Sequence, residues 1–169
     1  YLIEQAAKAC DTLHLFVLSE DASLFPADVR MELVKKGTAH LPNVKVHPSG
    51  PYMISSATFP TYFLKKGEDA ARIQSELDIT LFASRIAPLF HITKRFAGEE
   101  PLDPVTRDYN EAMIRLLPQY SISFIKIART TAETPEGKPE VISASRVRKL
   151  LAETGVTEEV LQLVPPCTA

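Results

Sequence analysis

Residues 121–128 read Ser-Ile-Ser-Phe-Ile-Lys-Ile-Ala, in which apolar and polar side chains alternate along most of the segment. This alternation has the period of a β-strand and predicts one here. The run Leu-His-Leu-Phe-Val-Leu at 13–18 is almost entirely apolar, which is typical of a strand buried on both faces of a parallel sheet. Residues 44–47 and 91–96 are further strand candidates, and 52–54 should be extended.

Helical patterns separate these strands. A capping-box pattern, Ser75-x-x-Asp78, precedes one expected helix, Asp103-Pro104 opens another, and Gly37 should end a third. Because strands and helices alternate throughout, we expect an α/β fold with a doubly wound, mostly parallel sheet and helices on both faces. A loop rich in proline, glycine and glutamate should follow the strand at 121–128. The expected helices are 1–10, 26–36, 76–87, 104–117, 143–154 and a short one near the end.

Composition limits the class of protein. The chain has 169 residues, about the length of one domain, and its 45% hydrophobic content supports a buried core. Its net charge of −2 argues against binding nucleic acid by bulk charge. No apolar run approaches the ~18–20 residues needed to cross a bilayer, and no signal peptide opens the chain. We therefore expect a cytoplasmic protein that binds neither nucleic acid nor membrane.

The strongest candidate for chemistry is Ile142–Arg148, Ile-Ser-Ala-Ser-Arg-Val-Arg. Ser143 is placed as a helix N-cap, so free backbone N–H groups and the positive helix end would face the preceding loop. Ser145 adds a hydroxyl, and Arg148 adds a guanidinium able to bind phosphate through two hydrogen bonds. The segment predicts an anion site. The alternative is an ordinary capped helix whose arginines, Arg146 and Arg148, face solvent.

A second candidate is the turn after the strand at 91–96. Gly98 would let a ligand approach the backbone, and Glu99 and Glu100 would meet a ribose, a metal or an amine. An acidic, solvated turn is the alternative. Ser19-Glu20-Asp21 forms a similar acidic turn after the strand at 13–18. The four histidines and two cysteines show no metal-ligand spacing, so no metal site held by protein ligands alone is predicted.

Ile142–Arg148 is similar to the Ile-Ser-Ser-Thr-x-x-Arg motif of the HIGH-type nucleotidyltransferase superfamily, in which this motif closes over the phosphates of the nucleotide. Within that superfamily, the chain resembles the citrate lyase ligases over nearly its whole length. The further segments that carry the resemblance are Ser19–Asp21, Ile54–Pro60 with Tyr62 and Phe63, Phe96–Pro101, and Thr106 with Tyr109 and Asn110.

The resemblance implies a Rossmann-like nucleotidyltransferase fold and an AMP-forming acid–thiol ligase. Such a ligase converts ATP and acetate into acetyl adenylate and pyrophosphate. It then transfers the acetyl group to the prosthetic-group thiol of the citrate lyase acyl carrier protein, and Mg²⁺ offsets the charge of the triphosphate. On this basis Ser145 and Arg148 are the expected catalytic residues. The expected nucleotide-binding residues are Ser143, Ser145, Arg146, Arg148, Gly98 and Glu99.

One part of the superfamily pattern is missing. The His-x-Gly-His motif of these enzymes lies just before the helix that Tyr1 enters, and none of the four histidines replaces it. We therefore expect residues 1–169 to form one nucleotidyltransferase-like domain without its first strand and without a last helix, weak or inactive when alone. Two alternatives remain open. One is an adenylyltransferase for phosphopantetheine or a mononucleotide, whose phosphorylated acceptor suits Glu20 and Asp21 poorly. The other is a non-catalytic nucleotide-binding domain.

Overall fold

Four parallel-paired strands form the centre of the protein in a computed structural model. Strand β1 (Leu13–Val17) pairs with β2 (Val44–Pro48), and β3 (Lys94–Gly98) pairs with β4 (Ser123–Ile127), each pair in parallel. The two pairs are separate two-stranded sheets. The structure describes residues 1–20, 24–60, 68–100, 103–129, 131–133, 139–141, 144–165 and 168.

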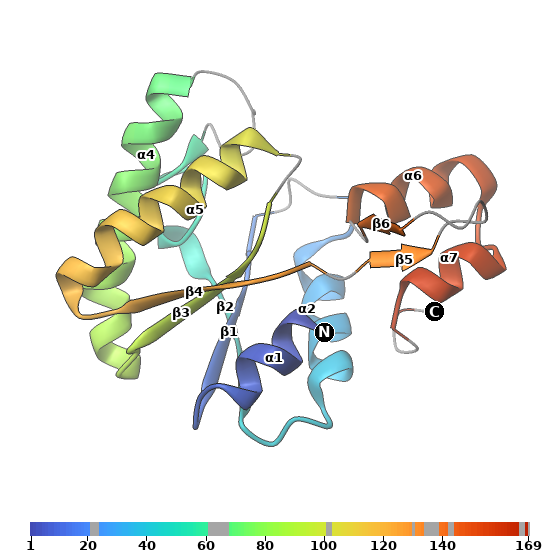
Figure 1. Ribbon diagram of the computed structural model, residues 1–169, viewed down its shortest axis with the longest axis horizontal. Helices are drawn as coiled ribbons and strands as arrows, with labels where there is room; N and C mark the ends of the chain where they lie inside the picture. The colour runs from blue at the N-terminus through green and yellow to red at the C-terminus, as the bar shows by residue number, and fades with distance from the viewer. Residues whose placement is uncertain are drawn as a thin grey trace.

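Helices cover both faces of the strands. Figure 1 shows α1 (Leu2–Lys8) and α2 (Ala27–Thr38) on one side, with α4 (Glu68–Leu81) and α5 (Pro104–Leu116) on the other. Alternate strand residues supply the two cores: Leu13 and Phe96 pack with α1, whereas Phe16 and Ala97 pack with α4 and α5. The predicted doubly wound α/β architecture is confirmed.

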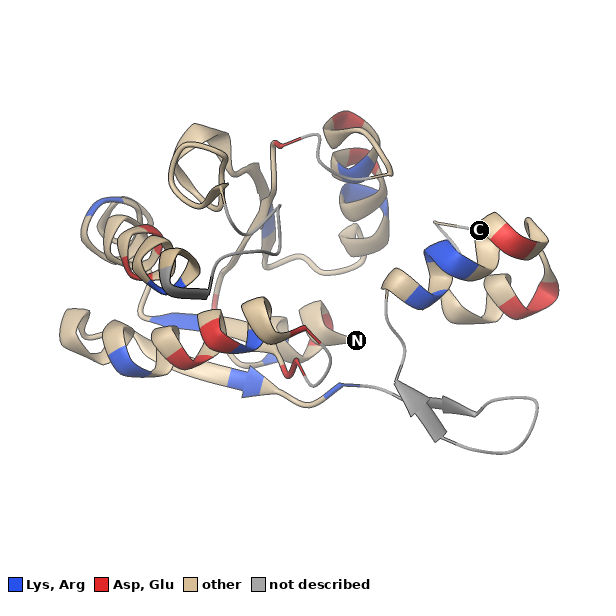
Figure 2. Ribbon diagram, turned by 90° about the horizontal axis from the view of Figure 1, so that it is seen from above, with Lys and Arg blue, Asp and Glu red and all other residues tan. Residues whose placement is uncertain are grey.

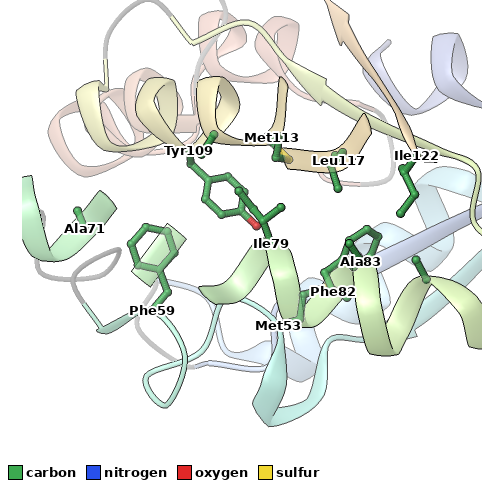
Figure 3. Packing of buried hydrophobic residues seen from close by; sticks show 12 residues of the cluster. Met53, Phe59, Ala71, Ile79, Phe82, Ala83, Tyr109, Met113, Leu117 and Ile122 are labelled. Carbon is green, nitrogen blue, oxygen red and sulfur yellow. The ribbon is translucent and has the colours of Figure 1, made fainter. Parts of the chain in front are cut away.

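The larger core lies between α4 and α5. Tyr109 and Met113 of α5 face Ile79 of α4 and the neighbouring Phe82 (Figure 3). Phe59 packs against the same cluster and is fully buried. Each buried side chain of this size contributes about 1.5–3 kcal/mol relative to its exposed state. This core fixes the two helices that flank β3 and β4.

Several helix boundaries agree with the sequence pattern. Asp103 caps α5 by accepting a hydrogen bond from the N–H of Val105, at 3.3 Å. Helix α6 (Ala144–Thr154) is followed by Gly155 at φ +70°, the left-handed conformation that glycine adopts readily. Helix α7 (Glu158–Leu163) completes the described C-terminal part. Short 3₁₀ turns complete the fold at η1 (Gly50–Tyr52), η3 (Ala87–Phe90) and η4 (Leu117–Tyr120).

The predicted start of the helix at residue 76 is wrong. Helix α4 begins at Glu68 and continues past Leu81 into a π-helical turn, η2 (Phe82–Ile86). Ser75 therefore lies in mid-helix and donates to the carbonyl of Ala71 at 2.6 Å, and Asp78 is completely buried. Serine and aspartate three residues apart resemble a capping box, but here both belong to the buried face of the helix.

Three other local predictions are wrong. Gly37 lies inside α2, which continues to Thr38. Ile54 has φ of +46° and is not extended. The segment predicted as a loop after β4 contains an antiparallel hairpin, β5 (Thr131–Glu133) and β6 (Pro139–Val141). None of the described helices is long and apolar enough to cross a bilayer.

Two histidines meet across the β1–β2 pair. The Nδ1 atom of His14 and the Nε2 atom of His47 are 3.0 Å apart. Both rings pack against Phe90, and the ring of His47 also packs against Phe16. Burial chiefly, and then the charges of His47 and Lys45, lower the pKa of His14. The folded protein therefore binds a proton at His14 less readily than the unfolded chain does.

This difference predicts a stability that depends on pH. The contribution of His14 should be complete above the unfolded pKa of about 6.5 and be lost as the pH falls below it. Urea unfolding at pH 7.5 and pH 5.5 measures the loss. Replacing His14 with phenylalanine keeps an aromatic ring in place and should reduce the pH dependence, whereas His40→Phe at an exposed position should not. An unchanged pH dependence in His14→Phe contradicts the prediction.

Candidate functional site

The carboxyl ends of β3 and β4 open into a polar cleft of about 370 Å³, here called the carboxyl-end cleft. Pairing between the strands continues past Gly98, since the N–H of Glu99 donates to the carbonyl of Ile127 at 2.9 Å. Doubly wound sheets bind ligands at this end of their strands. The cleft is lined by Glu99, Glu100, Arg107, Asn110, Glu111, Ile114, Lys126 and Arg129.

The two acids of this turn have different surroundings. Glu100 forms an ion pair with Arg129, and its other oxygen accepts from the N–H of Asp103 at 3.1 Å. Arg129 also donates from Nε to the carbonyl of Glu99 at 2.6 Å. Glu100 therefore links the ends of the strands to the start of α5. The side chain of Glu99 is exposed and lines the cleft, and its predicted role toward a ligand stays a prediction.

Gly98 packs against α1. A Cβ atom added at Gly98 would lie 3.0 Å from Cδ1 of Leu2. The carbonyl of Gly98 accepts from Nδ2 of Asn110 at 3.0 Å. The missing side chain thus allows the first turn of α1 to approach the end of β3. This is a structural reason for glycine here, and the predicted role of Gly98 toward a ligand stays a prediction.

Replacing Gly98 with alanine should lower the free energy of unfolding by about 1 kcal/mol, because the new methyl group crowds Leu2. The cost should nearly disappear when Leu2 is also alanine, since the contact is then removed. Urea unfolding of the two single variants and the double variant measures this coupling. Strictly additive effects would contradict the packing explanation.

Helix α6 carries the predicted phosphate-binding residues. Ser145 and Arg148 are both exposed, and Nη2 of Arg148 donates to Oγ of Ser145 at 3.4 Å. The structure thus brings a hydroxyl and a guanidinium together near the start of the helix, where Figure 2 shows the basic residues of α6. Ile142 and Ser143 lie outside the described residues.

Arg146 points the other way. Its side chain is only 15% exposed, and Nη2 lies 3.5 Å from a carboxylate oxygen of Glu159 on α7. Arg146 therefore holds α6 against α7. No hydrogen bond or ion pair among the described residues joins Ser145 or Arg148 to Gly98 or Glu99, and Figures 1 and 2 show the α6–α7 pair set apart from α4 and α5.

The acidic turn after β1 is held by another segment. The carboxylate of Glu20 accepts from the N–H of Ser56 at 2.7 Å and from its hydroxyl at 2.8 Å. These two hydrogen bonds lower the pKa of Glu20. The carbonyl of Glu20 accepts from Arg30 at 2.6 Å. Asp21 lies outside the described residues. Glu20 therefore fixes the turn after β1 to the segment that contains Ser56.

A buried polar network centres on Asp78 of α4, and it was not predicted from the sequence. Asp78 accepts three hydrogen bonds, from the N–H of Ile54 at 2.6 Å and the hydroxyls of Thr58 and Tyr109 at 3.0 and 2.7 Å. Arg95 donates from Nη2 to the Tyr109 oxygen at 2.9 Å. Burial raises the pKa of Tyr109. The position of Asp78 on the buried face of α4 is the sequence signal that was available.

Comparisons with known proteins cover the whole chain. A family model described as citrate lyase ligase C-terminal domain matches residues 1–169. The chain is 44% identical over 168 residues to the [Citrate [pro-3S]-lyase] ligase of Escherichia coli (strain K12), covering 99% of this chain and 47% of that protein. It is 44% identical over 172 residues to the protein of the same name from Klebsiella pneumoniae, with coverage of 99% and 48%. The chain thus spans about half the length of the curated relatives it matches.

Proposed function

Because this chain belongs to the citrate lyase ligase C-terminal domain family, we propose that it forms the nucleotide-handling part of an ATP-dependent ligase that acts on citrate lyase. The observation that carries this proposal is the 44% identity to named ligases across 99% of the chain. Identity of that extent covers the cleft, the turn after β1 and helix α6 together.

The proposed reaction has two steps. A carboxylate oxygen of acetate attacks the α-phosphorus of ATP, and pyrophosphate leaves as acetyl adenylate forms. The thiolate of the prosthetic group on the citrate lyase acyl carrier protein then attacks the acetyl carbonyl, and AMP leaves. Both steps ask the protein mainly for positioning and for stabilisation of charge on phosphate oxygens. The reaction is proposed to take place in the cytoplasm.

The residues of α6 are proposed to hold the phosphates. Ser145 and Arg148 already lie together on an exposed face, and Ser143 would add its hydroxyl at the start of the helix. Arg146 is proposed to act indirectly, by holding α6 in place, since its ion pair with Glu159 fixes α6 on α7. Gly98 and Glu99 are proposed to line the nucleoside side. For one nucleotide to contact both the residues of α6 and those of the carboxyl-end cleft, α6 must approach the cleft.

Mg²⁺ fits this site as an ion that arrives with the nucleotide. Glu100 is engaged by Arg129, whereas the exposed carboxylate of Glu99 lies at the mouth of the cleft. Mg²⁺ usually keeps several waters and binds one or two carboxylates together with substrate phosphates. When bound, it offsets the negative charge of the triphosphate, and Glu99 is the described residue placed to contact it.

We also propose that residues 1–169 are one nucleotidyltransferase-like domain completed by the part of the protein that the relatives carry beyond the aligned half. That part would supply a first strand and the His-x-Gly-His motif. Residues 1–169 alone should then have weak activity or none.

ATP–pyrophosphate exchange tests the function. The assay uses a fusion protein in which residues 1–169 follow the N-terminal half of the Escherichia coli relative, with and without acetate. Exchange that depends on acetate is the expected result. Exchange that ignores acetate but requires phosphopantetheine or its adenylated product would instead identify an adenylyltransferase. ATP binding without any exchange would identify a nucleotide-binding domain without catalytic activity.

A further inference from the structure

Two hydrogen-bond donors of one residue, Ser56, hold a carboxylate near the carboxyl ends of β1 and β2. The N–H of Ser56 donates to Oε1 of Glu20 at 2.7 Å, and its hydroxyl donates to the same oxygen at 2.8 Å. We call this N–H and hydroxyl the Ser56 donor pair. Glu20 lies in the turn after β1, at the end of the strands where doubly wound sheets bind ligands.

The turn that carries the donor pair is built without Glu20. The buried hydroxyl of Ser55 donates to the carbonyl of Pro51 at 2.6 Å. On the other side of the turn, the hydroxyl of Thr58 donates to Asp78 at 3.0 Å. Because these hydrogen bonds do not involve Glu20, the two donors keep their positions when the side chain of Glu20 leaves. Such a preorganised pair can accept another carboxylate without the cost of ordering the turn.

The side chain of Glu20 can leave while its backbone stays in place. The carbonyl of Glu20 accepts from Nη2 of Arg30 at 2.6 Å. The N–H of the preceding residue, Ser19, donates to Oγ of Ser49 at 3.0 Å. Rotation about the side-chain bonds of Glu20 is therefore enough to release the donor pair. Ser56 is exposed, so a small solute can reach the pair from solvent.

The donor pair suits an ionised carboxylate. Its two hydrogen bonds lower the pKa of Glu20, so they favour the ionised form of a carboxyl group over the neutral form. Both bonds go to Oε1 of Glu20, and Ser56 does not use Oε2. A free carboxylate bound in the same way keeps its second oxygen available. The first step of the proposed reaction needs such an oxygen, because it attacks the α-phosphorus of ATP.

We propose that the Ser56 donor pair is the binding site of the acid substrate, and that the side chain of Glu20 occupies it when no acid is bound. Acetate, which carries the same functional group as glutamate, displaces Glu20 by accepting both hydrogen bonds on one oxygen. The inference rests on the proposed function, because it takes acetate as the substrate. Ser56 is then a binding residue, and Glu20 is an internal competitor of acetate.

Two substitutions that break the same hydrogen bonds should have opposite effects on acetate-dependent ATP–pyrophosphate exchange by the fusion protein. Ser56→Ala removes one donor and should raise the acetate KM about tenfold, because hydrogen bonds to charged groups are among the stronger ones. Glu20→Ala removes the competitor and should lower the acetate KM about threefold, as for a site that is free only part of the time. If the two variants shift the acetate KM in the same direction, the contact is only structural and the proposal is overturned.

Two further variants serve as controls. Ser56→Thr keeps the hydroxyl and should keep the acetate KM close to that of the unaltered fusion protein. Ser84→Ala, at an exposed position where the hydroxyl donates to the carbonyl of Thr80, should have no effect on the acetate KM. The ATP KM should stay unchanged in Ser56→Ala. A higher ATP KM with an unchanged acetate KM in Ser56→Ala would assign the donor pair to a phosphate and overturn the proposal.

Saturation-transfer NMR measures acetate binding to the fusion protein without ATP and without catalysis. The Kd for acetate should rise in Ser56→Ala and fall in Glu20→Ala, and an equal Kd in Ser56→Ala and the unaltered protein would overturn the proposal. Acetate binding that depends on Ser56, without any acetate-dependent exchange, would support this inference and refute the function. Acetate-dependent exchange with an unaltered acetate KM in Ser56→Ala would support the function and overturn this inference.

Discussion

Replacing Asp78 with alanine is expected to lower the free energy of unfolding by about 3–5 kcal/mol, because several buried donors lose their acceptor at about 1–3 kcal/mol each. The substitution leaves three donors without an acceptor: the N–H of Ile54 and the hydroxyls of Thr58 and Tyr109. Arg95 is affected as well, because it donates to the Tyr109 oxygen, and the Tyr109 hydroxyl in turn donates to the lost carboxylate. Buried donors that lose their acceptor cost far more than the same groups in water.

Urea unfolding of Asp78→Ala measures this effect. Asp108→Ala is the matched control, because Asp108 lies on α5 with its side chain 61% exposed. The control should change the free energy of unfolding by no more than about 0.5 kcal/mol, which is typical of substitutions at surface positions. Asp78→Asn keeps one acceptor oxygen and should fall between the two. A loss in Asp78→Ala as small as that of Asp108→Ala would show that the network does not hold the core.

Replacing Arg148 with alanine in the fusion protein should weaken ATP binding about tenfold or more, because a hydrogen bond from an arginine to a charged phosphate contributes about 1.5–3 kcal/mol. The residue is exposed, and its one described contact is with Ser145. The substitution should therefore leave the stability of the protein almost unchanged. The ATP dependence of acetate-driven exchange measures the loss.

Two other substitutions on α6 sharpen this test. Lys149→Ala removes an exposed positive charge one residue away and should leave the ATP dependence nearly unchanged. Arg146→Ala breaks the contact with Glu159, so it should lower stability as well as exchange. If Arg148→Ala and Lys149→Ala have the same small effect, α6 does not hold the phosphates.

Much of the fold was predictable because its signals are local. The alternation at 121–128 matches β4, and Asp103 caps α5 as its sequence context indicates. The pairing of Glu32 with Lys36 on α2, at 2.6 Å, follows from helical spacing alone. In each case, the residue pattern and the tertiary structure favour the same conformation.

The errors arise where tertiary contacts override local pattern. Ser75 and Asp78 match a capping box, yet Asp78 is buried because Ile54, Thr58 and Tyr109 all donate to it. These donors come from distant parts of the chain. Ile54, whose N–H is one of these donors, also has a left-handed backbone with φ of +46°, for which there is no local sequence signal.

The sequence predicted which residues belong to the candidate site better than it predicted how they are arranged. Ser145 and Arg148 share an exposed face at the expected spacing. Arg146 was expected beside them, but its side chain contacts Glu159 of α7. Neighbouring residues of a helix point in different directions, so Arg146 can face α7 while Ser145 is exposed. The contact of Gly98 with Leu2 is a packing effect between segments that lie far apart in the sequence.

The outer edges of β1 and β3 also have a consequence for handling the protein, because among the described strands β1 pairs only with β2 and β3 only with β4. An exposed strand edge is a template on which another polypeptide can add by backbone hydrogen bonding. Residues 1–169 present two such edges beside one cavity of about 510 Å³, so separate copies can exchange or stack strands there. Self-association of the isolated chain should grow with its concentration, and light scattering across a dilution series would show the aggregates disperse as the protein is diluted.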